Sequence, residues 1–399
     1  MTEDQSIATA PNVAAAQFAP QPLAGLASPA GPASPADIVG EFSIAGVCEE
    51  IRPFGGGHIN DTFLSSWRDG GGIARYIHQR VNDKVFRRPD EVMENILRVT
   101  SHIRGELSAS GVDDVERRTL TVLPARSGLP WFRDAEGGWW RTYRFIERTH
   151  SRDCVASAEQ AAMLGAAIGD FQAMLADMPP PRLRETIPAF HDMEKRYERF
   201  DEAAAADVRG RAAAAAPEIL FMAENRNRGG ALARAMRAGL LPARICHNDA
   251  KLNNILLDDD TSEALCVVDL DTVMPGTVLF DFGDLVRTVA STAPEDETDL
   301  SRVGFSLELF RALLAGYLSK AGAFLVPAEK ELLGEAGRSL AQIMGLRFLT
   351  DFLEGDVYYK ISRPSHNLDR CRNQIAFIRS MDAASGDIGR VTKEELSKY

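Results

Sequence analysis

The stretch that decides the fold is His-Asn-Asp-Ala-Lys-Leu-Asn-Asn-Ile-Leu-Leu at residues 247–257, followed by Ala-Leu-Cys-Val-Val-Asp-Leu-Asp at residues 264–271. Two short apolar runs flank a polar turn rich in aspartate, which is a pattern typical of a β-hairpin. Pairing the two strands brings Asn254, at the start of the first strand, close to Asp269, at the end of the second. Asp249 lies in the loop just before the hairpin. We therefore expect three oxygen-bearing side chains to converge from one short segment.

These side chains suit phosphoryl transfer. A carboxylate can orient an attacking hydroxyl and accept its proton, and an amide oxygen with a second carboxylate can hold Mg²⁺ against nucleotide phosphates. The spacing of His247, Asp249 and Asn254 matches the kinase catalytic loop H-x-D-x-x-x-x-N. We predict that Asp249 is the catalytic base and that Asn254 and Asp269 are the Mg²⁺ ligands. The alternative is an ordinary turn, in which Asp and Asn side chains bond nearby backbone.

A second candidate metal triplet, Asp281-Phe282-Gly283, lies further along the chain. It follows the Met-Pro-Gly turn at residues 274–276, so Asp269 is nearer to the expected place. We interpret Asp281 and Asp284 as structural residues that tie down the catalytic loop or cap a helix beginning near Asp284. Residues 258–260, three consecutive aspartates, are interpreted as a solvated turn.

The hairpin resembles that of the aminoglycoside phosphotransferase and choline kinase superfamily, whose usual form is H-G-D-x-x-x-x-N followed by I-D-W. This chain has Asn248 in place of the glycine and Leu270 in place of the tryptophan. These departures, with Val-Asp-Leu-Asp-Thr-Val-Met-Pro-Gly at residues 268–276, resemble the N-acetylhexosamine 1-kinases. The resemblance covers most of residues 45–380. It implies an α+β, two-lobed protein-kinase-like fold with a small β-rich N-lobe and a larger, mainly helical C-lobe that carries the hairpin.

Three segments are expected along the chain. Residues 1–38 are rich in Ala, Pro and Ser, which predicts a disordered tail. Residues 39–147 contain the predicted strands and one main helix of a nucleotide-binding N-lobe. Residues 148–399 are mostly helical in pattern and form the predicted catalytic and substrate-binding C-lobe.

Composition narrows the class of protein. The net charge of −12 argues against a nucleic-acid partner. The five cysteines are scattered and odd in number, which favours a reducing cytoplasm over a disulfide scaffold. No apolar run is long enough to span a membrane, and no signal peptide is recognisable. The oligomeric state cannot be read from the sequence.

A glycine turn and the strand after it are candidates for phosphate binding. Gly55, Gly56 and Gly57 would let backbone N–H groups approach phosphate oxygens closely, and the resemblance supports this through the following His-Ile-Asn. The strand at residues 75–81 contains no lysine to contact the phosphates. Strand alternation leaves Arg80 as the replacement, or Gln79 if the register differs by one.

Two further N-lobe assignments complete the nucleotide site. Glu94, on a helix predicted over residues 90–108, is a candidate partner of Arg80, with a solvated glutamate as the alternative. The resemblance implies that residues 144–147 form the hinge that offers backbone groups to adenine, which assigns Phe145 and Glu147 to nucleotide binding.

The substrate wall is predicted on a helix near the C-terminus. Arg347, Asp351 and Glu354 have helical i, i+4 and i+7 spacing and form a charged stripe. It is either a surface salt-bridge ladder or a polar wall for a polyhydroxyl substrate, and the resemblance favours substrate contacts from Arg347 and Tyr358. His191 is interpreted as a structural histidine.

The resemblance implies an ATP- and Mg²⁺-dependent kinase that converts an N-acetylhexosamine such as N-acetylglucosamine or N-acetylgalactosamine to the sugar 1-phosphate. The residues alone indicate only a small polar alcohol. One alternative is another acceptor, such as an aminoglycoside, choline or homoserine, which Arg347 disfavours and Asp351 and Glu354 leave open. The other is a nucleotide-binding pseudokinase, which the missing lysine supports and the intact Asp249, Asn254 and Asp269 oppose.

Overall fold

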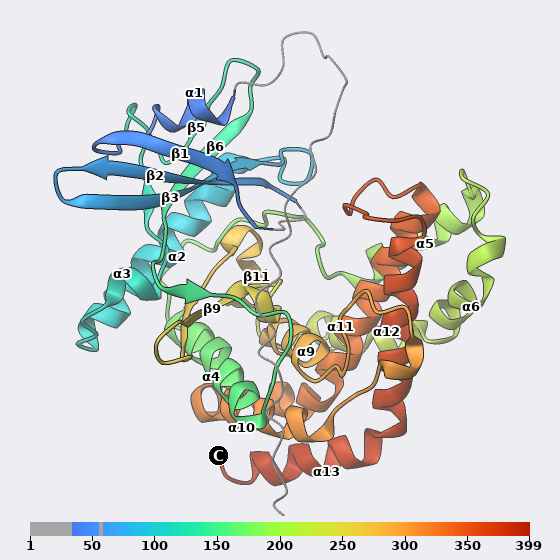
Figure 1. The fold of residues 1–399 in the computed structure, drawn as a ribbon. Coiled ribbons are helices and arrows are strands. Elements are labelled where there is room, and N and C mark those ends of the chain that lie inside the picture. The colour runs from blue at the N-terminus through green and yellow to red at the C-terminus, as the bar shows by residue number, and fades with distance from the viewer. Residues whose placement is uncertain (1–33, 56–58) are drawn as a thin grey trace, which may run out of the picture.

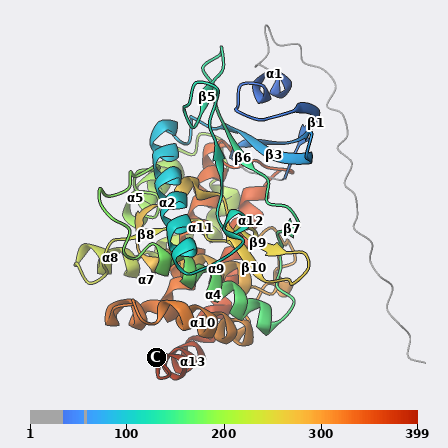
Figure 2. The same ribbon diagram turned by 90° about the vertical axis from the view of Figure 1, so that its left-hand side faces the viewer.

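The computed structural model describes residues 34–55 and 59–399. An antiparallel sheet lies at one end of the molecule and a larger, mainly helical part at the other, with α10 and α13 furthest from the sheet (Figures 1 and 2). The last strand of this sheet is β6 (Trp139–Arg144), and the first long helix of the second part is α4 (Ala158–Met174). The expected α+β, two-lobed fold is confirmed. Within the part of the chain that is described, no helix combines the length and the apolar character needed to cross a membrane.

The N-lobe sheet has the strand order β1-β2-β3-β6-β4, with β5 attached to β6. Neighbouring strands are antiparallel throughout. Their bounds are β1 (Val47–Pro53), β2 (Asp61–Asp69), β3 (Gly72–Val81), β4 (Val122–Leu123) and β5 (Phe132–Arg133). The glycine-rich turn between β2 and β3 ends at Gly72, whose φ of 131° is open to glycine but strained for other residues.

Helix α1 (Pro35–Val39) covers the outer face of the sheet. Ile38 and Val39 are each 3% exposed, because they join apolar clusters that contain Trp140 and Trp67 respectively. The predicted tail boundary at residue 38 is therefore too late, since residues 35–38 already belong to the fold. Residues 1–33 of that predicted tail lie outside the described residues.

Helix α2 (Pro89–Ala109) covers the inner face, close to the predicted bounds. Val92, Met93, Ile96 and Val99 are at most 1% exposed, and their helical spacing forms one apolar stripe against the sheet. Asn95 ties this helix to the C-lobe, because its Nδ2 donates to the Val273 carbonyl oxygen at 3.0 Å. The helix therefore has a fixed position relative to the segment that follows the catalytic hairpin.

The C-lobe is built around α11 (Pro327–Glu354), which contacts α9 (Val278–Val289) and α12 (His366–Ala383). Helix α4 and α10 (Leu307–Ala321) pack backbone to backbone, and a Cβ at Gly316 would lie 1.8 Å from the Ala162 carbonyl oxygen. The other α-helices of the C-lobe are α5 (Met193–Ala206), α6 (Ala216–Glu224), α7 (Arg226–Gly229), α8 (Ala231–Arg237) and α13 (Ser385–Leu396). The short helix α3 (Val115–Arg118) belongs to the N-lobe.

The predicted hairpin is present as β9 (Ile255–Asp258) and β10 (Ala264–Val267), with β7 (Thr149–His150) pairing β9. A second pair, β8 (Arg244–Cys246) with β11 (Met274–Gly276), flanks it. The Val268 N–H donates to the Asn254 carbonyl oxygen at 2.9 Å, which closes the open end of the hairpin as expected.

Two details of this region differ from the prediction. Helix α9 begins at Val278 rather than near Asp284, so Asp281 lies in its first turn. The aspartate turn is not wholly solvated, because Asp258 is 6% exposed and accepts a hydrogen bond from Arg117 Nη2 at 2.7 Å. Asp258 and Arg117 therefore tie the hairpin to the N-lobe. Spacing along the sequence does not reveal this contact, because the two residues are far apart in the chain.

Candidate active site

Asp281, in the first turn of α9, holds the backbone of the catalytic loop. Its two carboxylate oxygens accept the His247 N–H at 2.9 Å and the Asn248 N–H at 2.7 Å. Gln172 Nε2 donates to the same carboxylate at 2.9 Å, and the Tyr317 hydroxyl donates to Gln172 at 2.6 Å. Asp281 therefore positions the backbone of the loop, in agreement with its interpretation as a structural residue.

Asn248 occupies the position where the usual loop has a glycine, and its conformation and contacts show why an asparagine fits there. Its φ of 63° lies in the left-handed region, which Asn tolerates better than most residues. Its Nδ2 donates to the carbonyl oxygens of Cys246 and Thr272, each at 3.0 Å. The side chain thus links the catalytic loop to the segment after Asp269, which a glycine cannot do. His191 Nε2 lies 2.8 Å from the Asn248 carbonyl oxygen, which gives His191 a structural role.

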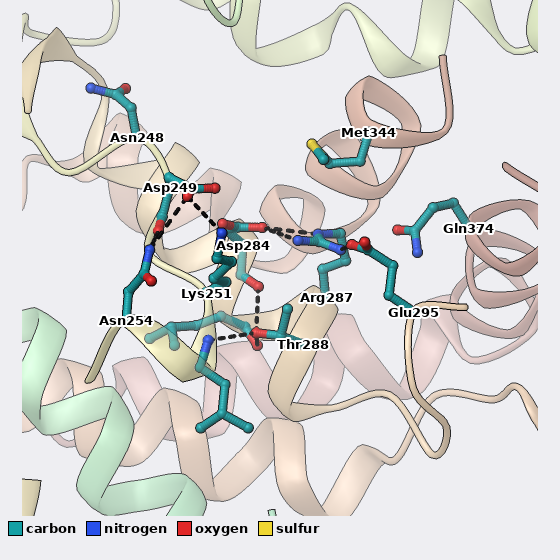
Figure 3. Close-up of polar contacts among 12 residues, drawn as sticks. Asn248, Asp249, Lys251, Asn254, Asp284, Arg287, Thr288, Glu295, Met344 and Gln374 are labelled. Atoms are coloured by element: carbon teal, nitrogen blue, oxygen red, sulfur yellow. Dashed lines mark hydrogen bonds and ion pairs between the residues drawn. The ribbon is translucent and has the colours of Figure 1, made fainter. Parts of the chain in front are cut away.

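The Asp249 side chain is 29% exposed and lines a cleft. Figure 3 shows it beside Lys251 and Asn254. Lys251 Nζ donates to Asp249 Oδ2 at 2.9 Å, and Asn254 Nδ2 donates to the Asp249 carbonyl oxygen at 2.8 Å. Burial acts to raise the pKa of Asp249, but the charge and hydrogen bond of Lys251 outweigh it and hold the pKa below its usual range. The carboxylate is therefore ionised at neutral pH and able to accept a proton. Sequence reasoning missed Lys251, because a lysine near an aspartate is common.

Asn254 and Asp269 fit the requirements of a Mg²⁺ site. The Asn254 Nδ2 is used by Asp249, so its Oδ1 is the atom left to bind a cation. The Asp269 carboxylate makes no hydrogen bond to any described residue and is exposed toward the cleft. The surrounding protein and the nearby Asp271 carboxylate raise the pKa of Asp269. A divalent cation with oxygen ligands would relieve this concentration of negative charge.

The cleft-facing residue of β3 is Gln79, and the expected placement of Arg80 is wrong. The side chain of Arg80 lies on the opposite face, where its Nε is 4.0 Å from Asp134 Oδ2. Strand alternation explains this, because Tyr76 and His78 are buried with Arg80 on the outer face. Glu94 is not its partner either, since it lies 3.4 Å from Arg184 Nε.

Arg141 on β6 lies beside Gln79 on this side of the sheet, and its side chain is buried. Gln79 Oε1 accepts hydrogen bonds from Arg141 Nε at 3.0 Å and Arg141 Nη2 at 2.8 Å. Arg141 Nη1 lies 2.5 Å from the Oδ1 of Asp271, which is two residues after Asp269. Sequence reasoning missed Arg141 and Asp271, because only the pairing of β3 with β6 sets Arg141 opposite Gln79.

The predicted hinge lies beside the glycine turn. The ring of Phe145 packs edge-on against Phe54 with 5.8 Å between centroids, and Phe54 precedes Gly55. Glu147 forms an ion pair with Arg75, and Arg75 Nε donates to its Oε1 at 3.0 Å. Gly55 has a φ of 71°, as a glycine turn requires, whereas Gly56 and Gly57 lie outside the described residues. Phe145 and Glu147 thus hold the hinge in place through their side chains.

A cleft of about 540 Å³ runs from Gln79 past Asp249 and Asp269 into the C-lobe. We call its C-lobe end the distal end. Its lining residues from α9, the following loop, α11 and α12 include Arg287, Glu295, Asp296, Met344, Arg347, Phe348, Tyr359, Arg370 and Gln374.

Arg347 lines the distal end, but the rest of the predicted charged stripe does not. Asp351 accepts the backbone N–H groups of residues 357–359 at 2.8–3.0 Å, and Glu354 pairs with Arg199. Tyr358 lies in a smaller adjoining pocket, with its hydroxyl 3.4 Å from Arg347 Nη2. Tyr359 lines the cleft instead. The turn that Asp351 holds decides which of the two tyrosines faces the cleft.

Residues 50–324 match the phosphotransferase enzyme family, and the chain belongs to that family. Its structure is similar to an aminoglycoside phosphotransferase from Alicyclobacillus acidocaldarius, with 12% identity, a TM-score of 0.57, and coverage of 91% of this chain and 98% of that one.

Two further solved structures are similar. A microcompartment-associated aminopropanol kinase has 15% identity, a TM-score of 0.57, and coverage of 88% of this chain and 97% of that one. A spectinomycin phosphotransferase in complex with ADP and spectinomycin has 11% identity, a TM-score of 0.52, and coverage of 86% and 94%. At these identities the likeness shows the fold. The family match adds that the chain is a small-molecule phosphotransferase.

Proposed function

We propose that this chain is an ATP- and Mg²⁺-dependent kinase that phosphorylates the anomeric hydroxyl of an N-acetylhexosamine, either N-acetylglucosamine or N-acetylgalactosamine. The resemblance of residues 268–276 to the N-acetylhexosamine 1-kinases suggests the sugar. The charge balance of the distal end is the observation that supports an uncharged acceptor. A sugar 1-phosphate would be the product. A cytoplasmic location is proposed with it, supported by five free cysteines.

The carboxylates at the distal end are already paired. Glu295 forms an ion pair with Arg287, and Asp296 lies 3.7 Å from Arg363. Arg347, by contrast, has no carboxylate within ion-pair distance among the described residues. It is instead surrounded by the rings of three aromatic residues at 4.7–5.5 Å. A cationic acceptor would meet no free carboxylate there and would be repelled by Arg347.

The proposed chemistry assigns one task to each residue of the catalytic loop. Asp249 orients the acceptor hydroxyl and takes its proton as the oxygen attacks the γ-phosphorus and ADP leaves. Lys251 places a positive charge beside the same carboxylate. Asn254 Oδ1 and Asp269 would hold Mg²⁺, which when bound would neutralise phosphate charge. Arg347 would donate to an oxygen of the acceptor.

Two of the similar structures point to a second acceptor class. The aminopropanol kinase and the spectinomycin phosphotransferase suggest an amine-bearing alcohol as the alternative. The paired carboxylates of the distal end disfavour it. A pseudokinase is disfavoured as well, because Asp249 and Asp269 are both present and both line the cleft.

The test is ADP release with Mg²⁺-ATP against N-acetylglucosamine, N-acetylgalactosamine, glucose, galactose, choline, homoserine and an aminoglycoside. The expected result is turnover on an N-acetylhexosamine, with a product that shows the acid lability of an anomeric phosphate. Turnover only on an amine-bearing alcohol would replace the acceptor class. Nucleotide binding without turnover of any acceptor would argue for a pseudokinase.

A further inference from the structure

Three of the buried polar atoms that lack a hydrogen-bond partner among the described residues belong to residues at the distal end of the cleft. They are Tyr359 Oη, Arg370 Nε and Gln374 Oε1, none of which is satisfied within the described residues. Arg370 is 6% exposed and Gln374 is 2% exposed, yet all three residues line the cleft. Buried polar groups in native proteins are nearly always hydrogen-bonded, and an exception calls for an explanation. A ligand in the cleft would satisfy them.

The orientation of Gln374 is set by its neighbours. Its Nε2 donates to Asn373 Oδ1 at 3.2 Å, and Asn373 Nδ2 donates to the Pro294 carbonyl oxygen at 2.8 Å. One N–H of the Gln374 amide is therefore used, and its Oε1 has no partner among the described residues. Gln374 accordingly offers the cleft a hydrogen-bond acceptor.

Arg370 offers a donor one helical turn away on α12. Its guanidinium lies over the ring of Phe348 at 5.4 Å, and its Nε is 3.8 Å from Glu295 Oε1, too far for a hydrogen bond. Glu295 is bound by Arg287, which in turn lies 2.7 Å from Asp284. Figure 3 shows this series of ion pairs, Asp284–Arg287–Glu295, between Asp249 and Gln374. The charge of Glu295 is thereby balanced without its forming a hydrogen bond to Arg370 Nε.

We propose that Arg370 and Gln374 form a subsite for an uncharged hydroxyl or amide substituent of the acceptor. A hydroxyl can accept from Arg370 Nε–H and donate to Gln374 Oε1 at the same time, and an acetamido group carries both functions as well. A quaternary ammonium can do neither. A primary ammonium satisfies only Gln374 and is repelled by Arg370. This subsite rests on the proposed function, because it assumes that the acceptor occupies the distal end.

Met344 provides the apolar side of the subsite. It lines the same end of the cleft, and its Sδ accepts from Arg347 Nη1 at 3.5 Å. Figure 3 shows Met344 and Gln374 on neighbouring helices, and both line the cleft. A sugar ring or acetyl methyl group can pack on Met344 while its polar substituents reach α12.

The test combines Gln374→Met and Arg370→Met with acceptor analogues that lack one hydroxyl or the acetamido group. The matched control is Arg372→Met, on the same helix, where Arg372 bonds Glu218 away from the cleft. We expect either subsite variant to raise the KM for the acceptor by about tenfold, equivalent to about 1.4 kcal/mol. The KM for ATP should stay unchanged in the subsite variants, and the control should keep the wild-type KM for both substrates.

The analogues supply the readout that a general structural effect would not move. One analogue should be a poorer substrate for the wild-type protein, and the same omission should cost Gln374→Met nothing further. Equal penalties in wild type and variant, or parallel changes in the KM for ATP, would overturn the subsite while leaving the kinase assignment intact. Turnover confined to cationic alcohols would overturn the proposed acceptor class and the subsite together.

Discussion

Arg141 of the N-lobe and Asp271 of the C-lobe form an ion pair across the cleft, with Arg141 Nη1 2.5 Å from Asp271 Oδ1. Their side chains are 1% and 3% exposed, so the pair is shielded from water. Asn60 Nδ2 donates to the other oxygen of Asp271 at 2.7 Å. Two N-lobe side chains therefore hold a carboxylate that lies two residues after the candidate metal ligand Asp269. The lobes are joined beside the site, without a lysine on β3.

The Arg141→Met variant should lose about 3–5 kcal/mol of unfolding free energy, because it leaves Asp271 buried without its counter-charge. Denaturant unfolding measures this loss. The matched control is Arg80→Met, which should cost about 0–1 kcal/mol, because Arg80 lies 4.0 Å from Asp134 and Asp134 keeps its hydrogen bonds from Gly138 N–H and Trp140 Nε1. The double variant Arg141→Met with Asp271→Leu should recover part of the loss. Equal effects of Arg141→Met and Arg80→Met would contradict the importance of the buried pair.

The Asp249→Asn variant should lower kcat by about 10²–10⁴-fold, because it removes the proton acceptor. Affinity for Mg²⁺-ATP, measured by calorimetry without acceptor, should remain close to wild type. Asp260→Asn serves as the control, since this exposed turn residue forms an ion pair with the exposed Arg148 away from the cleft. Undiminished turnover in Asp249→Asn would exclude Asp249 as the base.

The Asp269→Ala variant should weaken nucleotide binding in the presence of Mg²⁺ by at least about tenfold. Losing a residue that binds the metal directly should cost at least as much metal affinity as losing a residue that only hydrogen-bonds to a metal ligand. Binding of ATP in the presence of EDTA should change much less. Titration calorimetry at matched ionic strength separates the two. A variant with the same Mg²⁺ dependence as the wild-type protein would remove Asp269 from the metal site.

The Arg347→Met variant should raise the KM for the acceptor by about 10- to 100-fold, as expected for a lost hydrogen bond to a charged group. The KM for ATP should not change. Arg199→Met is the matched control, because Arg199 bonds Glu354 outside the cleft. If Arg347→Met instead improved turnover of choline while leaving sugar turnover unaffected, the charge argument for a neutral acceptor would fail.

The unfolding free energy should rise with pH between about 4 and 6.5 because of His78. Burial between Ser65 and Thr142 lowers the pKa of His78 from 6.5 to about 4. In this window the unfolded chain binds a proton that the folded protein does not, so acidification costs up to about 3 kcal/mol, all of it lost by about pH 4. His78→Gln should flatten this slope relative to wild type in urea unfolding at a series of pH values. An unchanged slope would contradict the buried neutral histidine.

The hairpin and its three site residues were predictable because they lie within one short segment. Spacing along the chain fixes which side chains a hairpin brings together, so Asp249, Asn254 and Asp269 converge as expected. The hydrophobic periodicity of residues 90–108 likewise placed α2 almost to the residue. These features depend on local geometry, which the order of residues largely dictates.

Contacts between distant segments required the tertiary structure. The register of β3 against β6 set Gln79 and Arg141 on the cleft side and turned Arg80 outward, a difference of one residue that alternation alone left open. The turn held by Asp351 brought Tyr359 rather than Tyr358 to the cleft. The sequence by itself therefore determined the fold class and the catalytic loop. Long-range pairing and burial decided which cations and polar groups surround that loop, because these depend on segments that meet only after folding.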